Sequence, residues 1–153
     1  MLTKKTIAFA GVLLLFFFAC QQPATRVKLP LEGTWQLVAA TSTEKDSTKS
    51  TFNPDVKMIK IINGTHFAFF SHDLNQGKDS SKAQFSAGGG TYELKDSTYT
   101  EHLEYFNTRQ WEGGTFQFSI RIKADTLVQE GIEKVEKLGI DHIIRETYVR
   151  LKN

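Results

Sequence analysis

From residue 33 onward, the sequence is a series of short runs with period-2 alternation, separated by turn signals. The clearest run is 115–123, in which apolar and polar residues alternate. Its apolar positions are Phe116, Phe118, Ile120 and Ile122. Such alternation gives a strand one dry face and one wet face. About eight runs have this strand character: 33–40, 56–62, 65–71, 91–95, 98–106, 115–123, 126–130 and 142–151.

Tight turns between neighbouring runs predict an antiparallel meander. Asn63-Gly64 lies between two apolar runs and is the strongest short hairpin signal, because both central positions of its turn require positive φ. Asp96-Ser97 forms a second tight turn. Antiparallel strands joined by hairpins lose their exposed edges when the sheet closes. We therefore predict one all-β domain over 31–153, a single eight-stranded (about 8 to 10) antiparallel barrel.

One segment before Gly139 is open to two interpretations. Ile132, Val135 and Leu138 have helical spacing, which could produce one or two helical turns. A mobile loop explains the same residues equally well. Either interpretation leaves the prediction of a barrel unchanged.

The amino-terminal segment has the pattern of an export signal. A basic start precedes the apolar run 7–19, which at about thirteen residues is shorter than the roughly 20 that a transmembrane helix needs. Cys20, the single cysteine of the chain, follows at once. We predict a signal peptide at 1–19 and a polar tether at 20–30.

The residues around this junction resemble a bacterial lipobox, with the sequence Phe17-Phe18-Ala19-Cys20. The resemblance implies that Cys20 is acylated and becomes the first mature residue. Several acyl chains on one residue give stable membrane anchoring. Because Gln21 rather than aspartate follows, we predict an outer-membrane lipoprotein that faces the periplasm. The alternative is an ordinary secreted protein with an unpaired thiol.

Cleavage before Cys20 also removes the net charge. Removing 19 of the 153 residues leaves 134, and losing Lys4 and Lys5 reduces the 19 basic residues to 17, equal to the 17 acidic ones. A neutral chain has no electrostatic footprint for nucleic acid. With one cysteine no internal disulfide can form, so a packed core must stabilise the domain.

The ends of the domain resemble those of lipocalins. Gly33-Thr34-Trp35 at the first strand matches the family's G-x-W signature, and Arg150 lies at the end of the last strand. The resemblance implies that the indole of Trp35 plugs the closed end of the barrel and that the Arg150 guanidinium lies across it. Such a cation–π contact contributes roughly 0.5–2 kcal/mol.

A wider resemblance covers about residues 30–152 and is carried by 88–106, 112–118 and 145–150. These segments are similar to lipocalin-like domains of small lipoproteins and secreted proteins of Gram-negative bacteria, which largely lack assigned functions. The resemblance implies a lipocalin or fatty-acid-binding type of barrel. It implies no particular ligand and no catalytic residue.

The run 98–106 predicts a charged group inside the barrel. Its more apolar face carries Tyr99, Glu101, Leu103 and Tyr105, so this face should point inward. A buried carboxylate costs several kcal/mol unless it is paired. Arg145 shares a face with apolar residues of the last strand. We predict a Glu101–Arg145 pair rimmed by the two tyrosines. The alternatives are a cluster that only ties strands together, or a one-residue register error that leaves Glu101 in solvent.

These residues predict non-covalent binding of a small apolar ligand in the barrel mouth. The wall residues would be Phe67, Phe69, Phe116 and Phe118, and the polar contacts Tyr99, Glu101, Tyr105 and Arg145. The alternatives are a structural or partner-binding envelope protein with a filled barrel, and, less favoured, an enzyme that uses Glu101 as a base. No pair of histidines has the spacing that would hold one metal ion on a strand, so we expect no cofactor.

Overall fold

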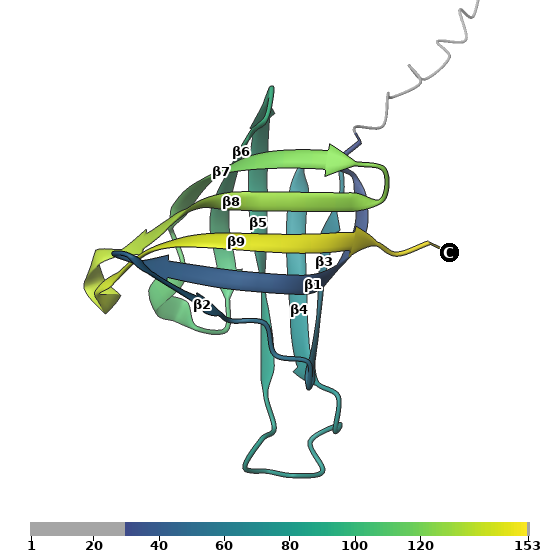
Figure 1. The fold of residues 1–153 in the computed structure, drawn as a ribbon, viewed down its shortest axis with the longest axis vertical. Helices are drawn as coiled ribbons and strands as arrows, with labels where there is room; N and C mark the ends of the chain where they lie inside the picture. The colour runs from purple at the N-terminus through teal and green to yellow at the C-terminus, as the bar shows by residue number, and fades with distance from the viewer. Residues whose placement is uncertain (1–29, 153) are drawn as a thin grey trace, which may run out of the picture.

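The strands follow one another in chain order around a closed sheet (Figure 1). The computed structural model describes residues 30–152, so the predicted signal peptide, Cys20 and most of the tether lie outside the described residues. Two short 3₁₀ helices interrupt the strands, η1 (Arg109–Trp111) and η2 (Glu136–Leu138). The strands are β1 (Gly33–Glu44), β2 (Ser47–Ser50), β3 (Val56–Ile62), β4 (His66–Asp73), β5 (Phe85–Lys95), β6 (Thr98–Phe106), β7 (Thr115–Lys123), β8 (Thr126–Val135) and β9 (Ile140–Arg150).

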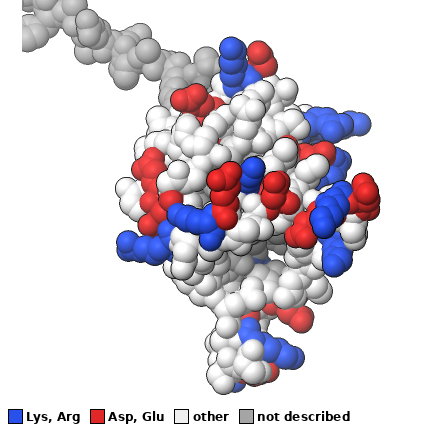
Figure 2. Space-filling view, turned by 90° about the vertical axis from the view of Figure 1, so that its left-hand side faces the viewer, with Lys and Arg blue, Asp and Glu red and all other residues white. Residues whose placement is uncertain are grey.

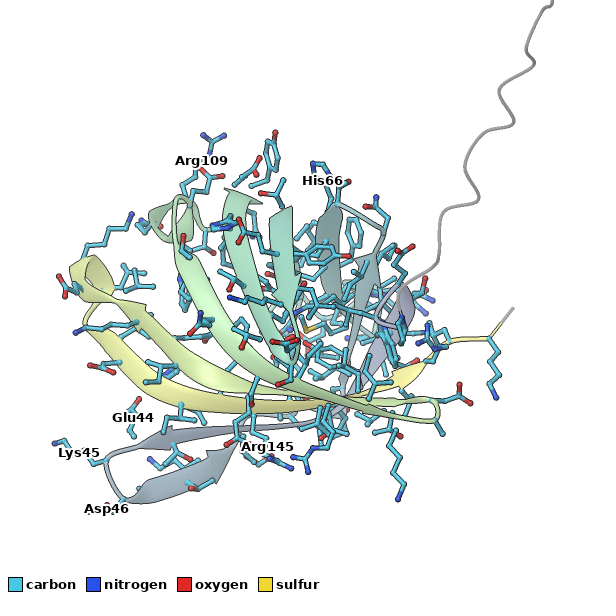
Figure 3. All side chains as sticks on the ribbon, turned by 90° about the horizontal axis from the view of Figure 1, so that it is seen from above. Glu44, Lys45, Asp46, His66, Arg109 and Arg145 are labelled. Atoms are coloured by element: carbon cyan, nitrogen blue, oxygen red, sulfur yellow. The ribbon has the colours of Figure 1, made fainter. Side chains whose placement is uncertain are left out.

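Antiparallel pairing closes eight of these strands into a barrel. Each strand from β3 to β9 pairs with the next, and β1 pairs with both β3 and β9. β2 lies outside the barrel and pairs only with the far end of β1, from Thr41 to Glu44. The tip of this hairpin, which carries Lys45 and Asp46, projects away from the barrel (Figure 3). The prediction of an all-β, eight-stranded antiparallel barrel is confirmed for the described residues.

Trp35 and Arg150 close one end of the barrel as predicted. They are register partners in the β1–β9 pairing, and the Arg150 Cζ atom lies 4.0 Å from the centroid of the Trp35 ring. The buried indole donates a hydrogen bond from Nε1 to the carbonyl oxygen of Leu31, at 2.8 Å. Arg150 donates to the carbonyl of Glu32 at 2.7 Å and to that of Pro30. These hydrogen bonds connect the segment before β1 and the end of β9 at the Trp35 ring.

Gly33 is needed at the first position of this motif for two reasons. Its φ of +148° lies in a region that side chains of L-residues rarely adopt. A Cβ atom at this position would also collide with the Arg150 guanidinium. The glycine therefore leaves the space in which the arginine crosses the indole.

A β-bulge in β6 changes which residues face the interior. Gly89 pairs with Tyr105, but the next residue, Gly90, pairs with Leu103, so Glu104 is an extra residue in β6. An extra residue reverses the alternation beyond it. The predicted inward position of Tyr105 is therefore wrong, since its side chain is 67% exposed. Phe106 faces the interior instead.

The segment before Gly139 is mostly strand. β8 continues to Val135, and only Glu136–Leu138 forms a 3₁₀ turn. The turn ends at Gly139, which has a left-handed conformation with φ of 65°. Strand pairing with β9 therefore overrides the helical spacing of the apolar residues, because Ile132 pairs with Ile143.

The surface carries charges of both signs. On the face shown in Figure 2, acidic and basic side chains are interspersed, and neither sign forms a large patch. Within residues 30–152, no helix has the length and apolar character required to span a bilayer.

Candidate ligand-binding cavity

The barrel contains a cavity of about 240 Å³, away from the Trp35 plug. Strands β3, β4, β6, β7, β8 and β9 and the 3₁₀ helix η1 contribute to its wall, which is part aromatic and part charged. The lining residues are Met58, Lys60, Phe69, Glu101, Leu103, Phe106, Trp111, Phe116, Gln129, Glu133, Glu146 and Tyr148.

Four aromatic rings form a continuous apolar side of this cavity. Phe69 and Phe106 meet edge to face with centroids 5.3 Å apart, and Phe106 meets Trp111 in the same way at 6.3 Å. Trp111 then contacts Phe116, with centroids 5.9 Å apart. Aromatic pairs favour these edge and tilted geometries. Gly88 contributes by its small size, because a Cβ atom there would collide with the Phe69 ring.

A buried ion pair crosses the interior. Lys60 is 3% exposed and Glu101 is 7% exposed, and the Lys60 Nζ atom donates to Glu101 Oε1 at 2.8 Å. The same ammonium donates to Gln129 Oε1 at 3.1 Å. The three residues come from β3, β6 and β8, which are not neighbours in the sheet. The contact therefore joins three sides of the barrel through its centre.

Three aromatic rings surround the Lys60 ammonium. Its Nζ atom lies 5.4 Å from the centroid of Tyr148, 5.8 Å from that of Phe67 and 6.0 Å from that of Tyr99. Burial alone would lower the pKa of Lys60, but the carboxylates of Glu101, Glu146 and Glu133 raise it above its ordinary value. Lys60 is therefore held in its charged form.

Two further carboxyl groups of the cavity wall have raised pKa values. Burial raises the pKa of Glu146, and the Tyr148 hydroxyl donates a hydrogen bond to its Oε2 atom at 2.6 Å. Burial also raises the pKa of Glu133, which lies 3.0 Å from Nε2 of His142. Burial likewise raises the pKa of Tyr148 itself. The wall thus holds three carboxyl groups and a single lysine.

Glu101 points inward as predicted, but its predicted partner is wrong. Arg145 is on the outer side of β9, where it forms an ion pair with Glu130 of β8 (Figure 3). The inward residues of β9 are the even-numbered ones, which include Glu146 and Tyr148. Because Arg150 shares this face, the predicted Trp35–Arg150 contact already required Arg145 to point outward.

The aromatic residues predicted to contact a ligand fall into two groups, one that lines the cavity and one that is packed in the core. Phe69 and Phe116 line the cavity, as expected of wall residues. Phe67, Phe118 and Tyr99 also point inward, but they are packed in the buried core, where Phe67 and Tyr99 lie close to Lys60. The Tyr99 hydroxyl is buried and has no hydrogen-bond partner among residues 30–152. Their roles in ligand binding remain predictions.

Sequence reasoning missed Lys60, Gln129, Glu133 and Glu146. Glu146 could have been predicted, because it lies an even number of residues from Arg150 and therefore shares its face of the strand. No comparable signal marks Lys60. Both faces of β3 carry a lysine, Lys57 and Lys60, among apolar residues. Within the described part of the chain, no group of three or more histidine, cysteine or acidic side chains is arranged to hold a metal ion.

Fold and cavity together define a closed antiparallel β-barrel with an internal cavity that combines aromatic walls with buried charge. The chain belongs to the family described as a domain of unknown function, DUF4488, whose sequence pattern matches residues 30–153. No curated protein matches the chain.

Proposed function

We propose that this protein binds a small, largely apolar molecule non-covalently inside its barrel. The observation that carries the proposal is the cavity of about 240 Å³ with aromatic residues on one side and polar groups on the other. Protein interiors are normally packed with few voids larger than a water molecule. Concave sites with apolar walls and a few convergent polar groups are typical of small-molecule binding.

The volume restricts the size of the ligand. An apolar cavity of about 150 Å³ is large enough to bind benzene. Drug-sized ligands occupy pockets of about 300–1,000 Å³. A cavity of about 240 Å³ therefore suits a molecule with one ring rather than a long acyl chain.

The cavity and the buried ion pair each argue against one of the two alternative functions. A structural envelope protein with a filled barrel would have no need of such a void. An enzyme that used Glu101 as a general base would need its carboxylate free to accept a proton, but Lys60 already occupies the Glu101 Oε1 atom. The binding proposal is favoured by both observations.

For the cellular location, we propose that Cys20 carries the acyl anchor of an outer-membrane lipoprotein that faces the periplasm. The support is the sequence of the first 22 residues alone. Replacing Cys20 with Ser should abolish incorporation of labelled palmitate and release the protein from the membrane fraction. Retention of both properties would contradict the proposal.

A filled-cavity variant tests the binding proposal. Met58 lines the cavity, and Ile61 on the same strand faces outward. Benzyl alcohol and benzylamine titrated into the wild-type protein should quench or shift the fluorescence of Trp111. Met58→Trp should abolish binding without loss of the folded state, whereas Ile61→Trp should bind as the wild type does. Absence of binding to the wild type, or binding unaffected by Met58→Trp, would contradict the proposal.

A further inference from the structure

The wall of the cavity contains more negative than positive groups. Glu101, Glu133 and Glu146 line it, and among residues 30–152 Lys60 is the one lysine that does so. Glu133 is hydrogen-bonded by His142, which lies beside the cavity. Lys60 pairs with Glu101 and His142 contacts Glu133, so Glu146 is the carboxyl group of the wall that has no basic partner among residues 30–152. A cation beside Glu146 would supply that partner.

Lys60 is already engaged and is poorly placed to receive an anionic ligand. Its ammonium donates to Glu101 and Gln129 and is surrounded by three aromatic rings. A ligand carboxylate would have to displace Glu101 from this lysine and would then lie near the other two carboxyl groups. The geometry therefore disfavours fatty acids and other carboxylates.

Glu146 is the carboxyl group best placed to receive a cation. Its hydrogen bond from Tyr148 leaves acceptor positions on the carboxylate, and among residues 30–152 no basic side chain forms an ion pair with it. Glu146 and Met58 also border a second cavity of about 240 Å³, to whose wall Leu37 and Ala40 of β1 contribute. The carboxyl group is thus accessible from two cavities.

The aromatic side of the cavity favours the same class of ligand. Cations are attracted to the faces of Trp, Tyr and Phe rings, and the attraction increases when water is excluded. Trp111, Phe106 and Phe116 line the cavity that Glu146 also lines. An apolar body with an ammonium group would therefore satisfy both sides of the cavity.

We propose that the ligand is a small organic cation, an amine or quaternary ammonium on an apolar body, whose positive group is bound by Glu146. This inference rests on the proposed binding function and specifies its ligand class. Burial raises the pKa of Glu146, and a cation bound beside it would favour the ionised carboxylate.

Three probes of similar shape and different charge test this inference. Benzylamine, benzyl alcohol and benzoate are titrated into the full folded chain at pH 7 by calorimetry. We expect benzylamine to bind at least about tenfold more tightly than benzyl alcohol, and benzoate to show no binding.

Matched variants identify the carboxylate responsible. Glu146→Gln should remove the preference for benzylamine over benzyl alcohol, so that the two affinities become similar. Glu130→Gln, on the outer side of β8, should bind as the wild type does. Equal affinity of the wild type for amine and alcohol would overturn the inference and leave the binding function intact. Absence of binding for all three probes would overturn both.

Discussion

The closed end of the barrel and its central cavity each hold a cation against aromatic rings, but Arg150 is partly exposed whereas Lys60 is buried. At the closed end, Arg150 lies over one indole and donates to backbone carbonyl groups of residues close to Trp35 in sequence. In the centre, Lys60 depends on Glu101 and Gln129 from strands far from its own. At the closed end, Arg150 is stabilised largely by backbone carbonyl dipoles, which are present whatever the side chains are. The arrangement in the centre requires buried charge.

The comparison suggests that the two regions serve different purposes. Buried ion pairs are expensive to desolvate and often stabilise a protein less than apolar residues of equal volume would. The plug at Trp35 is explained by stability alone. Stability alone does not explain the excess of carboxyl groups around Lys60. A role in ligand binding would explain it.

The largest effect is expected at Lys60. Lys60→Met removes the one lysine of the cavity wall and leaves Glu101 buried without its partner, which should cost about 3–5 kcal/mol of the free energy of unfolding. Urea denaturation measures this loss. Lys57→Met, on the outer face of the same strand, is the matched control and should change stability by less than about 0.5 kcal/mol. A similar loss in the free energy of unfolding for the two variants would show that the Lys60–Glu101 pair does not stabilise the fold.

The second prediction concerns the bulge in β6. Phe106→Ala removes a ring that packs against Phe69 and Trp111 and should cost about 2 kcal/mol or more. Tyr105→Ala removes an exposed ring and should cost less than about 0.5 kcal/mol. Both values come from chemical denaturation. The reverse order would mean that the strand keeps a regular alternation and that Tyr105 faces the interior.

A smaller effect is expected at the closed end. Arg150→Lys keeps the charge but loses the planar group that covers the Trp35 ring and reaches two carbonyls, so stability should fall by about 1–2 kcal/mol. Arg121→Lys, exposed on β7, serves as the control and should leave the melting temperature unchanged. An Arg150→Lys variant as stable as this control would show that the stacked geometry contributes nothing.

The smallest effect has the opposite sign. The pKa of Glu146 is raised in the folded state, so folding favours its protonated form. The stability that this contributes is fully present at pH values below the unfolded pKa. It is lost as the pH rises through the folded pKa. Glu146→Gln should therefore melt at a slightly higher temperature than the wild type at pH 8, and the difference should vanish towards pH 4. Thermal melts across this range would contradict the account if the variant were less stable at pH 8.

The fold could be predicted because its determinants are local. Period-2 alternation in β7 and the hairpin signal at Asn63-Gly64 correctly predict the strands and the β3–β4 hairpin. The turn itself differs from the prediction, because neither residue has positive φ and the Asn63 side chain accepts hydrogen bonds from Thr65 and His66 instead. The contact between Trp35 and Arg150 was implied by the resemblance to lipocalins. The same period-2 alternation gave the inward position of Glu101.

The candidate site was less predictable because its determinants are distant. One extra residue, Glu104, reverses the alternation that placed Tyr105 inside, and a bulge leaves little trace in a run of mixed residues. The partner of Glu101 is 41 positions away on a strand whose two faces are equally apolar. The apolar neighbours of Arg145 favour an inward position, but Arg150 lies an odd number of residues away and faces the interior, so Arg145 must face outward.

The most direct test of the account is two-dimensional NMR of the isotopically labelled protein during a titration with benzylamine. The account predicts saturable shifts in the residues that line the cavity, with the largest changes at Trp111, Glu146 and their neighbours, and none at the Arg145–Glu130 pair on the outer surface. A spectrum that stays unchanged to high millimolar concentrations, or shifts confined to the outside of the barrel, would contradict it.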